Sequence, residues 1–111
     1  MLALSSSLRY FICCKPIDIR KGFDGLAGIV RNEFLQDPCS GSIYIFLNKN
    51  CTHIKILYWD GDGFAVFYKR LEKGRYTMPK HHLFYKELAK EALLMLLERL
   101  SFDSLKQKKR Y

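Results

Sequence analysis

The sequence has few of the residues that build metal centres and catalytic sites. Its four cysteines include no Cys-x-x-Cys pair, and the vicinal Cys13 and Cys14 could form only a strained mutual disulfide. The three histidines, His53, His81 and His82, belong to no recognisable Ser/His/Asp or Cys/His pattern. We therefore predict no catalytic residue, no metal ion and no cofactor.

Long apolar stretches are also missing. No window approaches the roughly 18 uninterrupted apolar residues that a membrane-spanning helix requires. Residues 1–7 contain no basic segment followed by an apolar stretch long enough for export. We expect no membrane contact and a cytoplasmic protein with reduced thiols, and leave association with the nucleoid open.

Acidic residues are scarce beside basic ones. The chain has 19 Lys and Arg against 11 Asp and Glu, a formal charge of +8. Such a charge creates a positive field that attracts polyanions in a salt-sensitive way, so nucleic acid is the leading partner class. Solubility alone would also account for a basic composition. Asp18, Asp24, Asp60 and Asp62 are explained as cap and turn residues, which argues against a two-metal nuclease.

The remaining composition is that of a folded protein. Of the 111 residues 49% are hydrophobic and 14% aromatic, enough for one compact core. We predict one domain over residues 1–105, followed by a basic tail at 106–111 that is too polar to fold alone.

Local patterns predict an α+β fold with a mostly antiparallel sheet of four or five strands. One helix lies between the first two strands, and another lies near the C-terminus. The run 43–47 is apolar throughout and should be a central strand covered on both faces. The predicted strands are 8–13, 43–47, 53–59, 64–71 and a short one at 75–77; the predicted helices are 19–35, capped by Asp18, and 83–100.

Two local features suggest contacts with a partner. Gly22, Gly25 and Gly28 clear one side of the first helix, either for close packing on the sheet or for a phosphate at the helix N-terminus beside Arg20 and Lys21. The second half of the sheet carries a group of cations and aromatic rings. This group suits contacts to a phosphate and a base, or simply protects an exposed sheet edge. Its members are Lys55, Trp59, Phe67, Tyr68, Lys69, Arg70, Lys73 and Arg75.

A long ordered series of segments resembles a known family. The series spans about residues 8 to 79 and consists of Ile17-Asp18-Ile19-Arg20-Lys21-Gly22-Phe23-Asp24-Gly25-Leu26, Asp37-Pro38, Ser40-Gly41, Lys55-Ile56-Leu57-Tyr58-Trp59-Asp60-Gly61-Asp62-Gly63-Phe64 and Tyr68-Lys69-Arg70-Leu71-Glu72-Lys73-Gly74-Arg75-Tyr76. It resembles the TnpB-type accessory proteins of the insertion-sequence-sixty-six group of bacterial transposons, which are distinct from the RNA-guided nucleases of the same name. The resemblance implies a protein that assists a separate, larger transposase carrying the catalytic residues.

Charge and resemblance together lead to one hypothesis for function. We predict a non-catalytic accessory protein that binds DNA and assists a transposase, with the C-terminal helix docking that transposase. The open alternatives are a protein adaptor without DNA contact and a stand-alone nuclease, and the oligomeric state stays undetermined. The predicted DNA-binding residues are Arg20, Lys21, Lys55, Trp59, Tyr68, Lys69, Arg70 and Arg75.

Overall fold

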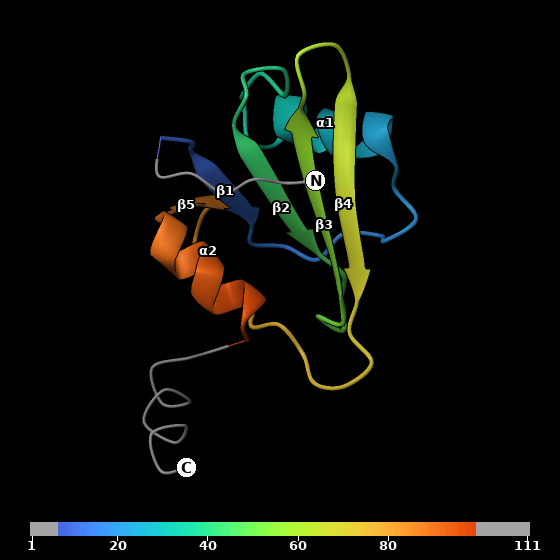
Figure 1. Cartoon of the computed structure of the whole chain (residues 1–111), viewed down its shortest axis with the longest axis vertical. Helices are drawn as coiled ribbons and strands as arrows, with labels where there is room; N and C mark the ends of the chain where they lie inside the picture. The colour runs from blue at the N-terminus through green and yellow to red at the C-terminus, as the bar shows by residue number, and fades with distance from the viewer. Residues whose placement is uncertain (1–6, 100–111) are drawn as a thin grey trace.

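The computed structural model describes residues 7–99 and has a five-stranded sheet at its centre (Figure 1). The strands follow the order β4-β3-β2-β1-β5, in which only β1 and β2 run parallel. They are β1 (Tyr10–Cys13), β2 (Ile43–Leu47), β3 (His53–Trp59), β4 (Phe64–Arg70) and β5 (Tyr85–Leu88). The predicted α+β class with a mostly antiparallel sheet is confirmed. The basic tail at 106–111 lies outside the described residues.

The central strand β2 is buried on both faces, as its uninterrupted apolar run predicts. Ile43, Ile45 and Leu47 belong to the core on one face, whereas Tyr44 and Phe46 belong to the core on the other. Alternation along the strand therefore divides the interior into two cores, one on each side of a single sheet.

The helix α1 (Phe23–Asn32) covers one of these faces, called here the α1 face. Its buried residues Leu26, Ala27 and Val30 recur at helical spacing and pack on the rings of β2. Phe34, which follows the helix, is fully buried among aromatic neighbours. Apolar burial of this kind stabilises a small domain more than helix propensity does.

The predicted start of this helix is wrong. The helix begins after Gly22, which makes no side-chain cap, rather than at residue 19 under an Asp18 cap. The Asp18 carboxylate instead accepts hydrogen bonds from the backbone N–H and the guanidinium of Arg20. An aspartate that bonds the amide two residues ahead forms a local turn, which competes with helix formation.

The glycines of α1 do not provide close packing against the sheet. A Cβ atom added at Gly22 or Gly28 would meet no atom within 4 Å. At Gly25 the nearest atoms are the Cβ and Cγ of Lys21, both 3.2 Å from such a Cβ. Gly25 thus makes room for a lysine side chain rather than for a strand.

The C-terminal part of the chain differs from the prediction. Residues 83–100 were expected to form one helix, but Tyr85–Leu88 form β5 and only Lys90–Leu97 form a helix, α2. Strand β5 pairs antiparallel with β1 and satisfies backbone groups that β1 would otherwise leave open at the sheet edge. This long-range pairing overrides the local helical spacing.

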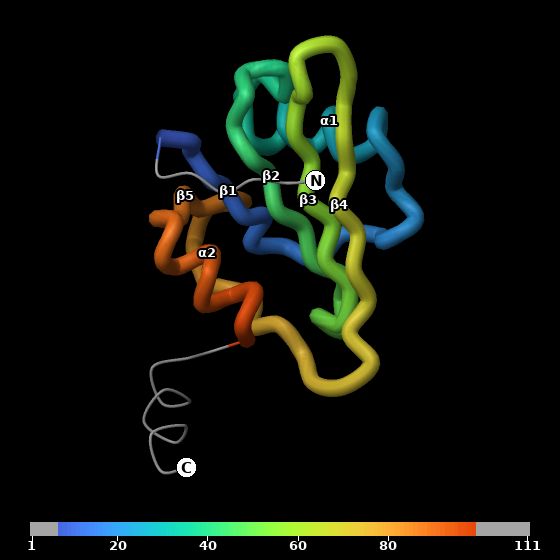
Figure 2. The backbone as a smooth tube through the Cα atoms, viewed as in Figure 1, coloured from blue at the N-terminus to red at the C-terminus, as the bar shows by residue number. Residues whose placement is uncertain are grey.

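The opposite sheet face, called here the α2 face, is covered by α2 and by the connection that leads to β5. Leu93 and Leu96 of α2 pack there with Tyr76 of the connection. Figure 2 shows this connection carrying the chain from β4, at one edge of the sheet, to β5 at the other. The predicted strand at 75–77 is absent from it, although the Tyr76 N–H donates a hydrogen bond to the Cys51 carbonyl.

Candidate nucleic-acid interface

The pairing of β3 with β4 decides which predicted residues share a surface. Lys55 pairs with Tyr68 and His53 pairs with Arg70, whereas Ile54 pairs with Lys69. Directly paired residues point to the same face, and neighbours along a strand point to opposite faces. Lys55, Tyr68 and Arg70 therefore lie on the α1 face, and Lys69 lies on the α2 face with Ile54.

Lys55 is the centre of the candidate site because it connects three segments. Its Nζ donates a hydrogen bond to the Lys21 carbonyl oxygen, 2.9 Å away, at the entrance to α1. The same nitrogen lies 4.8 Å from the centroid of the Tyr68 ring on β4. These two contacts hold the ammonium group in one position while leaving two of its three N–H donors for a ligand.

Tyr68 and His53 extend this surface along the strands. Tyr68 is 52% exposed, and its ring stacks on the His53 ring at a centroid distance of 6.0 Å. The His53 Nδ1 lies within hydrogen-bond distance of the Thr52 hydroxyl and the Asn48 side-chain amide. His53 belongs to no recognisable motif in the sequence, yet its place two residues before Lys55 puts it on the same face.

We name the Lys55 cluster as Lys21, His53, Lys55, Tyr68 and Arg70. Within residues 7–99, neither Lys21 nor Lys55 forms an ion pair, so no carboxylate neutralises either charge by direct contact. Arg70 differs, because its guanidinium is paired with Glu72 at 3.0 Å. The cluster therefore has two unpaired cations beside exposed aromatic rings.

Arg20 is close to the cluster in sequence but is already bound. Its guanidinium pairs with Asp18 at 2.7 Å, and both side chains are exposed. This contact holds the pKa of the Asp18 carboxyl well below its usual range, because Arg20 donates hydrogen bonds to the charged form. Within residues 7–99, Arg20 thus has a directly bonded carboxylate, whereas Lys21 interacts with Asp18 only at longer range.

The remaining predicted residues lie elsewhere. Trp59 shares the face of Lys55 but lies four residues further along β3, about 13 Å away at the usual strand rise. Its ring packs edge-on against Phe64 at a centroid distance of 5.0 Å, so it supports the hairpin. Arg75 is exposed in the connection before β5, and no contact among the described residues joins it to the Lys55 cluster.

The Asp60–Gly63 segment forms the turn between β3 and β4, and Cys13 is buried. The Asp60 and Gly63 backbones are joined by a hydrogen bond that closes the β3–β4 turn, where Gly61 has a positive φ of 75°. Burial raises the pKa of the Cys13 thiol to about 11. Within residues 7–99 no three His, Cys, Asp or Glu side chains gather as metal ligands would, and no helix there has the length and apolarity to cross a membrane.

Comparison with known proteins identifies the family. One relative, the uncharacterized protein y4jC of Sinorhizobium fredii, is 32% identical over 108 residues, which cover 97% of this chain and 92% of that protein. A second, the uncharacterized protein y4hO of the same organism, is 32% identical over 79 residues, 71% of this chain and 69% of the relative. No solved structure matches the chain. Residues 8–107 match the family described as IS66 Orf2 like protein, and the chain therefore belongs to that family.

Proposed function

We propose that this protein is a non-catalytic accessory factor of transposition that holds DNA by its phosphate backbone and assists a separate transposase. Family membership supports the link to transposition. The observation that carries the DNA-binding step is the half-buried Lys55, whose ammonium is fixed between the Lys21 carbonyl and the exposed Tyr68 ring. A net charge of +8 adds a field that attracts polyanions.

The chemistry of the cluster favours a phosphate over a base. The Lys55 ammonium keeps two free donors, and the Tyr68 ring already has Lys55 and His53 as neighbours. A base that stacked on Tyr68 would have to share the ring with them. A phosphate oxygen can bind the ammonium without any rearrangement, and contacts of this type position a protein on DNA without reading sequence.

The start of α1 adds to the same potential. Lys21 directly precedes Gly22, after which the first helical N–H groups have no partner within the helix. These groups and the helix dipole favour negative charge near the helix N-terminus. A phosphate held by Lys21 and Lys55 would therefore lie beside the positive end of α1.

The experiment is fluorescence-anisotropy binding of the full chain to labelled transposon-end DNA and to a scrambled duplex, over a salt series. Lys55→Ala is the test variant, and Lys69→Ala is its matched control, because Lys69 is an exposed lysine on the neighbouring strand but on the opposite face. We expect Lys55→Ala to weaken binding to both duplexes and to lower the salt slope by about 0.9, the value for one phosphate contact. Lys69→Ala should change the slope much less.

The outcomes separate the competing functions. Equal losses for the two variants would show a diffuse charge effect and would remove the Lys55 cluster from the proposal. A failure of the wild-type chain to bind either duplex at low salt would leave the second candidate, an adaptor that binds the transposase without touching DNA. In that case this chain and the transposase should copurify even after nuclease treatment.

A further inference from the structure

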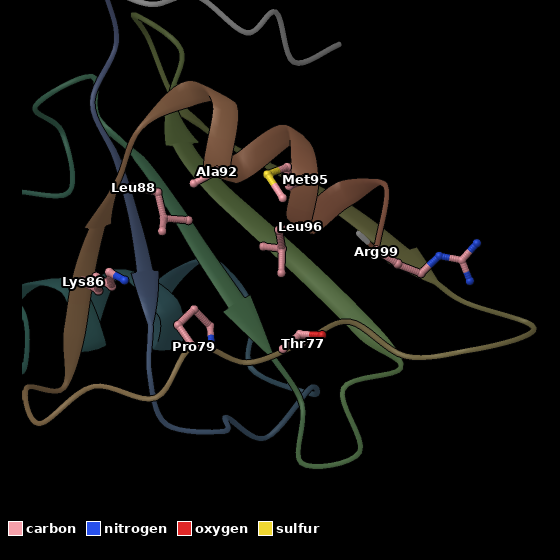
Figure 3. Close-up of a pocket in the computed structure, with 8 residues that line it drawn as sticks. All are labelled: Thr77, Pro79, Lys86, Leu88, Ala92, Met95, Leu96 and Arg99. Carbon is pink, nitrogen blue, oxygen red and sulfur yellow. The ribbon is translucent and has the colours of Figure 1, made fainter. Parts of the chain in front are cut away.

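A pocket of about 270 Å³ lies on the α2 face, between α2, β5 and the connection that precedes β5 (Figure 3). Leu88 and Leu96 form its floor and are 9% and 8% exposed. Pro79, Ala92 and Met95 form apolar walls. An apolar group entering the pocket would be removed from water, which is favourable in proportion to the area covered.

The size of the pocket limits what it can hold. Small-molecule and cofactor sites usually measure about 300–1,000 Å³, and this pocket lies just below that range. It is far larger than the roughly 30 Å³ that one water molecule occupies. One or two apolar side chains of another protein would fit it well.

Positive charge borders the apolar walls. Lys86 and Arg99 lie at opposite ends of the pocket in Figure 3, and both are exposed. Among residues 7–99, no carboxylate lines the pocket and neither cation forms an ion pair. Arg99 is held in place by a hydrogen bond of 2.7 Å from its Nη1 to the Lys73 carbonyl oxygen. Both positive charges at this pocket are therefore uncompensated by any described carboxylate.

We propose that this pocket docks a short acidic segment of a partner protein, in which a large apolar side chain is flanked by Asp or Glu. The apolar side chain would occupy the floor, and the flanking carboxylates would meet Lys86 and Arg99. Two cations at separate ends fit two carboxylates of a peptide better than the single carboxylate of a fatty acid. A DNA backbone, which offers phosphates and sugars, would leave the apolar floor unused.

This surface is separate from the one proposed to bind DNA. Leu88 and Leu96 belong to the core of the α2 face, whereas Lys55 lies on the α1 face. The sheet stands between the two surfaces, so a protein segment and DNA could be bound at once. The docking proposal goes beyond DNA binding and does not depend on it.

The test uses the full-length chain labelled with nitrogen-15 and a set of synthetic blocked peptides. The main probe is a peptide of alternating leucine and glutamate; the controls replace glutamate by lysine or leucine by serine. Sodium decanoate tests a small amphiphile. The protein variants are Lys86→Glu and Lys90→Glu, which change the net charge equally, although Lys90 lies outside the pocket at the start of α2.

We expect the leucine–glutamate peptide to shift the amide signals of Leu88, Ala92 and Leu96 in a saturable way. Lys86→Glu should weaken this binding about tenfold, since repulsion replaces attraction, and Lys90→Glu by less than about twofold. DNA affinity should be the same for the two variants.

The proposal is overturned if the lysine or serine peptide binds equally well, or if the shifts fall outside the pocket. Tighter binding of decanoate than of the peptide would also overturn it, in favour of a small-molecule site. None of these results bears on the Lys55 cluster, whose test is the salt slope of DNA binding.

Discussion

The Lys55 ammonium lies against the Tyr68 ring, 4.8 Å from its centroid, and the two residues are direct cross-strand partners. A lysine side chain usually loses about 1.5–2 kcal/mol of conformational entropy when a ligand fixes it. Here the ring and the Lys21 carbonyl already restrict the side chain before any ligand arrives. Lys55 is therefore preorganised for anion binding.

The first prediction concerns the Tyr68 ring. Tyr68→Ala should weaken DNA binding about two- to fivefold, which corresponds to the 0.5–1 kcal/mol of an exposed cation–π contact. Tyr68→Phe keeps the ring and should bind DNA like the wild type. Anisotropy titrations at one low salt concentration measure both variants. An equal loss in Tyr68→Phe would instead assign the contribution to the hydroxyl group.

The second prediction concerns the ion pair of Arg70 and Glu72. Glu72→Gln removes the carboxylate 3.0 Å from the guanidinium, so Arg70 becomes free to bind a phosphate. DNA affinity should rise about two- to threefold at low salt. Glu98→Gln is the control, because it makes the same charge change after the end of α2. Equal gains in both variants would exclude a specific role for Arg70.

The third prediction concerns the dependence of stability on pH. Arg9 donates two hydrogen bonds to the Glu87 carboxylate and lowers its pKa in the folded state. Below about pH 4.3, the usual pKa of an unfolded glutamate, the unfolded chain binds more protons here than the folded chain does. This contribution is present above that pH and is lost as the pH falls through the lowered pKa.

Glu87→Gln tests this relation. The variant should be less stable than the wild type at pH 6, and the difference should shrink as the pH falls below 4. Thermal unfolding at low ionic strength between pH 3 and pH 7 would measure it, since salt screens exposed pairs. A difference that stays constant over this range would contradict a charge effect of Glu87.

The fourth prediction concerns Leu35, which follows α1 with a positive φ of 54° and an exposure of 81%. A non-glycine residue in this conformation costs roughly 1–2 kcal/mol, and Leu35 has little burial to offset it. Leu35→Gly relieves this strain but adds the entropy that glycine loses on folding. The net stabilisation should be at most about 1 kcal/mol. Leu35→Ala, which retains Cβ, should show no such gain in chemical denaturation.

Local patterns in the sequence predict most of the sheet because β2, β3 and β4 each have a recognisable local signal. The apolar run of β2, the alternation of Ile54, Lys55 and Ile56 in β3 and the Gly-containing turn before β4 each indicate a strand. Strand β5 offers no such signal. Tyr85 and Leu88 are three residues apart, a spacing that also suits a helix, and only pairing with β1 decides between the two.

The candidate site was partly predictable for the same reason. Alternation places Lys55 on one face of β3, and the turn register then places Tyr68 beside it and Lys69 behind it. The grouping of Lys69 with Lys55 in one patch overlooked that alternation. The contact between Lys55 and the Lys21 carbonyl depends on how the segment before α1 crosses the sheet, which no local pattern encodes.

The pairing of β1 with β5 also has a consequence for synthesis on the ribosome. Residues Phe11 and Glu87 are cross-strand partners, so an early strand completes its hydrogen bonds only when a late one emerges. At translation rates of about 5–20 residues per second, the β1 edge would lack its β5 partner for roughly 4 to 15 seconds. During that interval the nascent chain has an unpaired strand edge that can pair with other chains. A chaperone or a strand of another molecule would have to cover this edge.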